Sequence, residues 1–130
     1  MKELRMTKWA GLFGAAICLS AYAQAAAENG IKIKSGEKIA FLGDSITAAG
    51  ARPGGYCQLV INGLKRSGVE VTGVFAGISG HKSNQMLARL NKDVLSKKPD
   101  WMTLSCGVND VWHGARGVKL EDYKKRSFRV

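Results

Sequence analysis

Three short polar clusters in this sequence contain residue types that could catalyse acyl transfer. They are GDS at residues 43–45, GISG at 77–80 and GVND at 107–110. A serine hydroxyl can attack a carbonyl carbon, and the oxyanion that forms must be met by fixed donors about 3 Å away. We therefore expect Ser45 to be the nucleophile, with oxyanion donors at its own N–H, the Gly80 N–H and the Asn109 amide. Glycine lets the backbone approach a substrate closely, and an asparagine amide donates without titrating.

The strands that must position these clusters are short and apolar. The run at residues 39–42 predicts a strand buried on both faces, because it lacks the alternation of a half-exposed strand. Residues 69–77 are rich in valine and end in glycine, which predicts a second strand, and residues 100–107 predict a third.

Helices are predicted between the strands and after the last one. In residues 54–68 the apolar positions at helical spacing are Tyr56, Leu59, Val60, Gly63 and Leu64. In residues 83–98 they are Met86, Leu87, Leu90 and Val94. Ser83 is the expected N-cap of this second helix, and Pro99 is expected to follow its end. A third helix is predicted to begin in KLEDYKKR, residues 119–126.

Alternation of strands and helices with short connections predicts an α/β domain of three layers around a parallel sheet. The three polar clusters then all follow the carboxyl ends of parallel strands. In an open α/β sheet these ends line the binding crevice, at the point where the strand order reverses. With the order 2-1-3, Ser45 lies in the middle, between the GISG loop and Asn109.

These clusters resemble the conserved blocks of the SGNH hydrolases, also called GDSL-type esterases and lipases. GDSIT is similar to the first block, GISG to the second and GVND to the third, and the resemblance covers about residues 38–126. It implies a flavodoxin-like three-layer fold and an esterase that hydrolyses acyl esters of carbohydrates or lipids. It also implies that Ser45 is the nucleophile and that Ser45, Gly80 and Asn109 form the oxyanion hole.

The family's fourth block, an Asp-x-x-His near the C-terminus that supplies the general base, is not recognised in the final segment KKRSFRV. We interpret His81 and His113 as standing outside that pattern and as poor replacements for the base. Residues 28–130 are therefore expected to be an incomplete SGNH esterase domain whose C-terminal part is missing. Such a chain would be weakly active or inactive, and its open sheet edge would make it poorly soluble.

Residues 1–27 have the pattern of a cleavable signal peptide. Lys2, Arg5 and Lys8 precede an apolar run that ends near Ala23, and small residues follow. The run is shorter than the roughly 20 residues that cross a bilayer. We expect a secreted or periplasmic protein with no stable membrane span after cleavage. A lipoprotein is disfavoured because Ile17 stands before Cys18, where a small residue is needed.

Composition and residue spacing limit the kinds of partner that the protein is expected to bind. The 130 residues have a formal charge of +10, but the cations are scattered, without the aromatic residues or motifs of a nucleic-acid site, so no nucleic-acid partner is expected. No cysteine and histidine cluster has zinc-binding spacing, so neither a metal nor a cofactor is expected. The expected partner is a small-molecule or polysaccharide acyl ester. Cys57 and Cys106 could form a disulfide or be two buried small side chains.

Several residues also have structural interpretations. Asp44 is expected to cap the turn after the first strand, and Asp110 to hold the Asn109 loop. Trp101 and Trp112 are interpreted as core and crevice packing.

The sequence leaves one alternative function open and disfavours two others. A noncatalytic extracellular module that binds glycans or esters on the same fold stays open as the alternative function. A phosphate-binding loop is disfavoured because His81 stands where its glycine is required, and an α/β-hydrolase elbow because Thr47 replaces its last glycine.

Overall fold

The computed structural model describes residues 30–126, and residues 34–126 belong to one compact unit. The predicted signal peptide, residues 1–27, lies outside the described residues. Within the described residues, no helix has the length and apolar character needed to cross a membrane.

Three parallel strands form the sheet, in the order β2-β1-β3. They are β1 (Lys38–Gly43), β2 (Thr72–Gly77) and β3 (Trp101–Leu104). Phe41 in β1 is opposite Phe75 of β2 on one side and Thr103 of β3 on the other. The predicted strand order is confirmed, and the central strand is the one that leads into Ser45.

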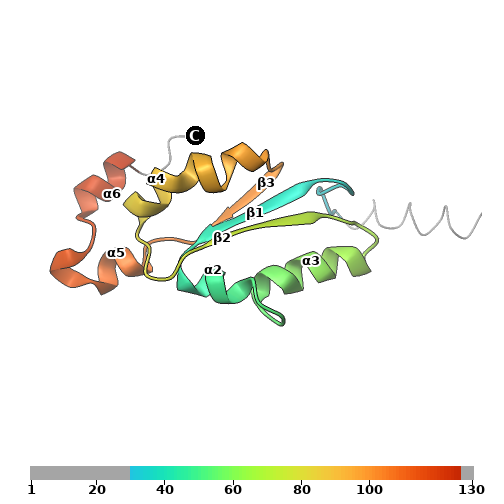
Figure 1. The fold of residues 1–130 in the computed structure, drawn as a ribbon, viewed down its shortest axis with the longest axis horizontal. Coiled ribbons are helices and arrows are strands. Elements are labelled where there is room, and N and C mark those ends of the chain that lie inside the picture. The colour runs from blue at the N-terminus through green and yellow to red at the C-terminus, as the bar shows by residue number, and fades with distance from the viewer. Residues whose placement is uncertain (1–29, 127–130) are drawn as a thin grey trace, which may run out of the picture. The chain divides into compact units, whose positions relative to one another are not determined.

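Helices cover both faces of this sheet (Figure 1). In chain order they are α2 (Ser45–Gly50), α3 (Tyr56–Arg66), α4 (Ser83–Asp93), α5 (Val108–Trp112) and α6 (Leu120–Arg126), with 3-10 turns at Leu95–Lys97 and Gly114–Arg116. Helices α2 and α3 lie on one face and α4 on the other, which confirms the three-layer α/β architecture. The sequence did not predict α2 or α5 as helices, because each is shorter than two turns and shows little periodicity.

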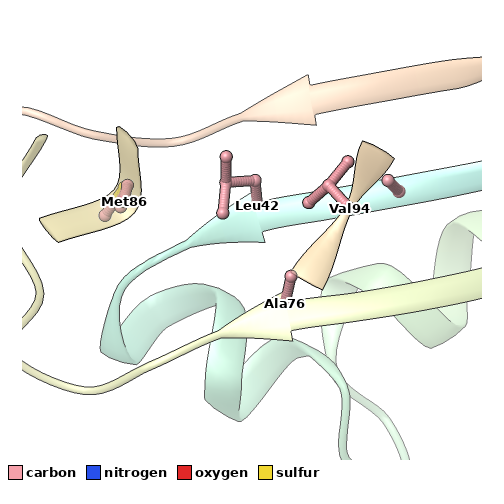
Figure 2. Packing of buried hydrophobic residues seen from close by; sticks show 5 residues of the cluster. Leu42, Ala76, Met86 and Val94 are labelled. Carbon is pink, nitrogen blue, oxygen red and sulfur yellow. The ribbon is translucent and has the colours of Figure 1, made fainter. Parts of the chain in front are cut away.

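The best-buried apolar cluster lies between the sheet and α4 (Figure 2). Its members are Ala40, Leu42, Ala76, Met86 and Val94. Met86 and Val94 are fully buried, and a buried side chain of this size contributes about 1.5–3 kcal/mol. On the opposite face Phe41 stacks on Phe75, with ring centroids 5.7 Å apart, and meets Tyr56 edge-on at 6.1 Å. The predicted burial of β1 is confirmed, since residues 39–42 are all buried.

The predicted inner faces of the two long helices need correction. In α3 the fully buried residue is Cys57, whereas Leu59 and Val60 are exposed. In α4 Leu87 is exposed, although Met86 is buried. Cys57 faces α2, since its Sγ lies 3.9 Å from the Thr47 carbonyl.

Strand β3 is paired on one side only in the described part of the chain, and its apolar side chains are partly open to solvent. Trp101, Met102 and Leu104 are each exposed by more than a third. Trp101 anchors its ring through Nε1, which donates to Glu37 Oε2 at 2.6 Å. Trp101 is 39% exposed and Trp112 is 82% exposed, so the interpretation of these tryptophans as core and crevice packing is wrong for both.

Candidate functional site

Asp44 and Ser45 form the junction between β1 and α2. Asp44 is the N-cap of α2 and is buried, and its Oδ1 accepts a hydrogen bond from the Ile46 N–H at 3.0 Å. The capping prediction for Asp44 is confirmed, so Ser45 is not the N-cap. Ser45 is instead the first helical residue and is exposed, and the N–H of such a residue has no acceptor within its helix. The serine is therefore open to a ligand while its neighbour is fixed.

Two glycines let α2 lie directly against the strand ends. A Cβ on Gly43 would be 2.0 Å from Thr47 Oγ1, and a Cβ on Gly77 would be 2.2 Å from the Ala48 N. Thr47 is fully buried, and its hydroxyl is 2.9 Å from the Tyr56 hydroxyl. Any larger residue at either glycine would displace the helix that begins with Ser45.

Gly80 lies in the turn between β2 and α4. Its φ is +76°, a region that side-chain-bearing residues rarely adopt, and a Cβ there would meet nothing within 4 Å. The backbone conformation therefore requires glycine here, in addition to the close approach to substrate that the sequence predicts. The next residue, His81, donates its N–H to the Ile78 carbonyl at 3.3 Å, which closes the turn.

Asn109 connects the three polar clusters. Its Nδ2 donates to the His81 carbonyl at 3.1 Å and lies 3.5 Å from Asp44 Oδ2. The first contact joins it to the loop of Gly80, and the second joins it to the residue before Ser45. Because 3.5 Å is at the long limit of a hydrogen bond, the N–H facing Asp44 is only weakly held. The structure thus gathers the loops of all three predicted site residues at the carboxyl end of the sheet.

Asp110 joins the loop after β3 to the start of α4. Its buried carboxylate accepts hydrogen bonds from the Ser83 N–H, at 3.1 Å to each oxygen, and from the Ser83 hydroxyl. The prediction that Asp110 holds the Asn109 loop is confirmed, with a side-chain partner on another element. The prediction that Ser83 caps α4 is wrong: the cap is Lys82, whose N–H donates to Gln85 Oε1 at 3.0 Å.

The two histidines have opposite hydrogen-bonding partners. Arg89 Nε can only donate, so His81 Nδ1, 3.1 Å away, accepts and the neutral ring carries its proton on Nε2. The Asn109 carbonyl can only accept, so His113 Nδ1, 2.8 Å away, carries the proton and leaves the Nε2 lone pair available. We infer both tautomers from the partners. His113 therefore has the tautomer of a general base and His81 does not.

The interpretation that neither histidine stands in an Asp-x-x-His pattern is wrong, because Asp110 and His113 have that spacing. They do not act as a pair, however. The Asp110 carboxylate is bound by Ser83, and His113 Nδ1 bonds to the Asn109 carbonyl. Asp110 lies within α5 and its carboxylate is directed to α4, whereas His113 is the C-cap residue of α5 and its ring contacts a carbonyl of the same helix.

Sequence reasoning missed Arg89 in α4. Its side chain is only 10% exposed, and its guanidinium contacts backbone carbonyls of β1 and β2 as well as His81. A charged residue three positions after buried Met86 was the signal that could have identified it, because that position faces the sheet.

Other candidate ligand positions lie away from Ser45. An open hollow of about 400 Å³ lies beside β2 and α4, and Arg89 is one of the α4 residues that line it. Neither Ser45 nor Asn109 lines this hollow. Across residues 30–126, no three His, Cys, Asp or Glu side chains are grouped to hold a metal ion. Cys57 is a free, buried thiol, and Cys106 is a free, half-buried thiol whose Sγ is 3.6 Å from the Tyr123 hydroxyl.

Comparisons with known proteins agree with this geometry. The family model of the GDSL-like lipases/acylhydrolases matches residues 41–125. An acetylxylan esterase of Geobacillus stearothermophilus is 41% identical, with 63% of this chain and 43% of that protein covered. The chain therefore spans about half the length of the relatives it matches.

Solved structures have the same fold. The acetyl xylan esterase AlAXEase is 43% identical, with a TM-score of 0.62 over 69% of this chain and 48% of its own. A variant of Axe2, an acetyl-xylooligosaccharide esterase of G. stearothermophilus, is 35% identical, with a TM-score of 0.66 over 75% of this chain and 53% of its own. Two further structures are catalytic mutants of Axe2, one with a histidine and one with an aspartate replaced by alanine.

Proposed function

The chain belongs to the GDSL-like lipase/acylhydrolase family, and on this basis we propose that it carries the nucleophile and the oxyanion hole of an SGNH-type serine esterase. One observation carries the proposal: the Asn109 amide contacts both Asp44, which precedes Ser45, and the carbonyl of His81, which follows Gly80. The three groups that acyl transfer requires thus lie on loops that are joined to one another.

In this proposal Ser45 Oγ attacks the acyl carbon of an ester and loses its proton to a base. The carbonyl oxygen becomes an oxyanion that accepts hydrogen bonds from the N–H groups of Ser45 and Gly80 and from the Asn109 amide. Collapse of this intermediate expels the alcohol, which takes a proton, and leaves Ser45 acylated. Water then attacks the acyl carbon of the acyl-enzyme, and the same oxyanion hole binds the second oxyanion. This step releases the carboxylic acid and restores the serine.

The base is the part of this mechanism with the least support in the described residues. Catalytic mutants of Axe2 replace a histidine and an aspartate, whereas no histidine within residues 30–126 is hydrogen-bonded to a carboxylate. We therefore expect the chain by itself to be weakly active or inactive. Loss of a triad member leaves mainly the catalysis that comes from binding and the oxyanion hole.

The proposed substrate is an acetyl ester of a carbohydrate, with xylan as the first polymer to test. The names of the relatives support this choice, since they are esterases of acetylxylan or acetyl-xylooligosaccharides.

The proposal also includes export, with residues 1–27 as a signal peptide and residues 28–130 as the esterase domain. N-terminal sequencing of protein recovered from a secreting host tests it: a start near residue 28 supports export, and retention of Met1 contradicts it.

Reaction of Ser45 with p-nitrophenyl phosphonates tests the esterase proposal directly. These reagents phosphonylate a serine whose oxyanion hole is formed, and mass spectrometry of peptides locates the label. We expect Ser45 to be labelled and Ser45→Ala to remain unlabelled. Ser79→Ala is the matched control, because Ser79 is also an exposed serine in this group of loops. Equal labelling of both variants would contradict the proposal.

A noncatalytic module that binds acylated glycans is the second candidate. It is favoured by one observation, that in the described part of the chain no hydrogen bond joins Ser45 to His81 or His113. Such a module would retain acetylated xylo-oligosaccharides in isothermal titration without being labelled at Ser45. Binding together with labelling would instead favour the esterase.

A further inference from the structure

Arg89 has an arrangement of contacts that the chemistry proposed for Ser45 does not use. Its Nη2 donates to the Gly43 carbonyl at 3.0 Å, and its Nη1 donates to the Ala76 carbonyl at 2.9 Å. Its Nε donates to His81 Nδ1 at 3.1 Å. The remaining partner is Asp93, whose Oδ2 is 3.1 Å from Nη1. Three of these four contacts are therefore with β1, β2 and the loop after β2.

These partners lie next to the predicted catalytic groups in the chain. Gly43 is the last residue of β1, directly before Asp44 and Ser45, and its carbonyl also accepts from the Ile78 N–H at 3.1 Å. One carbonyl thus holds both Arg89 and the start of the loop that leads to Gly80. A hydrogen bond from a charged donor is roughly twice as strong as a neutral one, and the Arg89 side chain is only 10% exposed.

His81 extends the same arrangement to the far end of the loop. It follows Gly80 directly, and its carbonyl accepts from the Asn109 amide at 3.1 Å. Its ring is held by Arg89 through Nδ1, so the side chain and the backbone of one residue are fixed from two different elements. Rotation of the peptide that carries the Gly80 N–H would disturb both contacts.

A simple ion pair does not account for this geometry. An i,i+4 ion pair such as that of Arg89 with Asp93 contributes little stability on a helix surface and needs no burial. A lysine could form that pair, but its single ammonium could not meet three acceptors that match the planar fork of a guanidinium.

We propose that Arg89 is the positioning residue of this site: it fixes the end of β1 against the Gly80 loop and holds His81 as the Nε2–H tautomer. This inference rests on the proposed function for its catalytic consequence, because the loop it fixes supplies an oxyanion donor. A misplacement of about 1 Å in such a donor can cost on the order of 100-fold in rate. The tautomer of His81 follows from the contacts alone.

Nitrogen-15 NMR of the histidine rings in the unmodified chain is the first test. At pH 7 we expect His81 Nδ1 to have the shift of an unprotonated acceptor and Nε2 the shift of a protonated nitrogen. A protonated Nδ1 would overturn the proposal without any variant. In Arg89→Lys we expect a mixture of tautomers, whereas Asp93→Asn keeps the single tautomer because it removes only the ion pair. The same tautomer in Arg89→Lys as in the unmodified chain would overturn the proposal.

The second test measures acylation of Ser45 by p-nitrophenyl acetate, per serine titrated with a phosphonate, so that misfolded molecules are not counted. We expect Arg89→Lys to lower kcat at least tenfold with KM changed less than twofold, and Arg66→Lys, at an exposed helix end, to have no effect. An unchanged kcat in Arg89→Lys would overturn the catalytic part of the proposal. If the unmodified chain does not react at all, Ser45 has no effective base, as the proposed function allows, and the NMR result alone decides the role of Arg89.

Discussion

The carboxylate of Asp110 accepts hydrogen bonds from both the N–H and the hydroxyl of Ser83, and both residues are buried. This contact joins α5 to the first turn of α4, and the two residues are 27 positions apart in the chain. It also fixes the residue after Asn109 and the third residue after Gly80. The donors of the proposed oxyanion hole are therefore held from behind by a contact that does not touch substrate.

Asp110→Asn is expected to lower the free energy of unfolding by about 1.5–3 kcal/mol, because hydrogen bonds to a buried charged group are lost or weakened. Urea unfolding followed by circular dichroism measures the change. Ser83→Ala should cost less, since only the hydroxyl bond is removed. The double variant should be more stable than the sum of the two losses predicts. Strict additivity would show that the two side chains do not interact.

Asn109→Ala is expected to reduce the rate of Ser45 acylation about 10²–10³-fold, the effect of removing one oxyanion-hole donor. Stability should change less, since the side chain makes one good hydrogen bond, to the His81 carbonyl. The pre-steady-state release of p-nitrophenol from p-nitrophenyl acetate gives this rate. Asn62→Ala, at an exposed position of α3, is the matched control. A loss below threefold in Asn109→Ala would remove Asn109 from the mechanism.

Gly43→Ala is expected to destabilise the fold by about 1–3 kcal/mol or more, since overpacking a well-packed site has this cost. Its new methyl group would lie 2.0 Å from Thr47 Oγ1, which is buried against the strand ends. Gly63→Ala is the opposite case, because Gly63 lies in α3 with nothing within 4 Å of its Cβ position. That variant should gain up to about 1 kcal/mol from helix propensity. Thermal unfolding of both proteins distinguishes the two signs.

The stability of the fold is expected to depend on the protonation of His81. Burial lowers the pKa of His81 below its usual 6.5, the charge of Arg89 lowers it further, and Asp93 acts in the opposite direction. The unfolded chain therefore binds this proton more readily than the folded one. The contribution is complete above pH 6.5 and is lost as the pH falls through the folded-state pKa. His81→Asn should flatten this part of a stability profile measured from pH 7.5 to 5, and an unchanged slope would contradict the assignment.

Local patterns in the sequence predicted a large part of this structure. Three apolar runs and two amphipathic segments indicated the strands and the long helices, and alternation indicated a parallel sheet, because parallel neighbours need crossovers. The placement of the three polar clusters after strand ends indicated which residues would meet. Asp44 could be identified as a cap because its position after a strand and before small residues is typical of one.

Side-chain partners between distant segments could not be predicted in the same way. The buried residue of α3 is Cys57, whose Sγ lies 3.9 Å from the Thr47 carbonyl of α2. Nothing in residues 54–68 identifies α2 as the neighbour of this face. Serine is a common N-cap residue, yet the Ser83 hydroxyl donates to the carboxylate of Asp110 in α5. In the sequence Arg89 has the character of a solvent-exposed helix residue. Only the fold shows that it donates to the carbonyls of Gly43 and Ala76.

The sequence by itself determined the α/β class, the order of the elements and the three segments after the strands in which Ser45, Gly80 and Asn109 lie, because these depend on periodicity and on turn-forming residues that act locally. Tertiary structure alone decided the tautomers of His81 and His113, the partner of Asp110 and the position of Arg89 between β1 and β2. The physical reason is that a hydrogen bond to a buried group is set by whichever donor or acceptor the fold brings within about 3 Å, and that neighbour is distant in sequence.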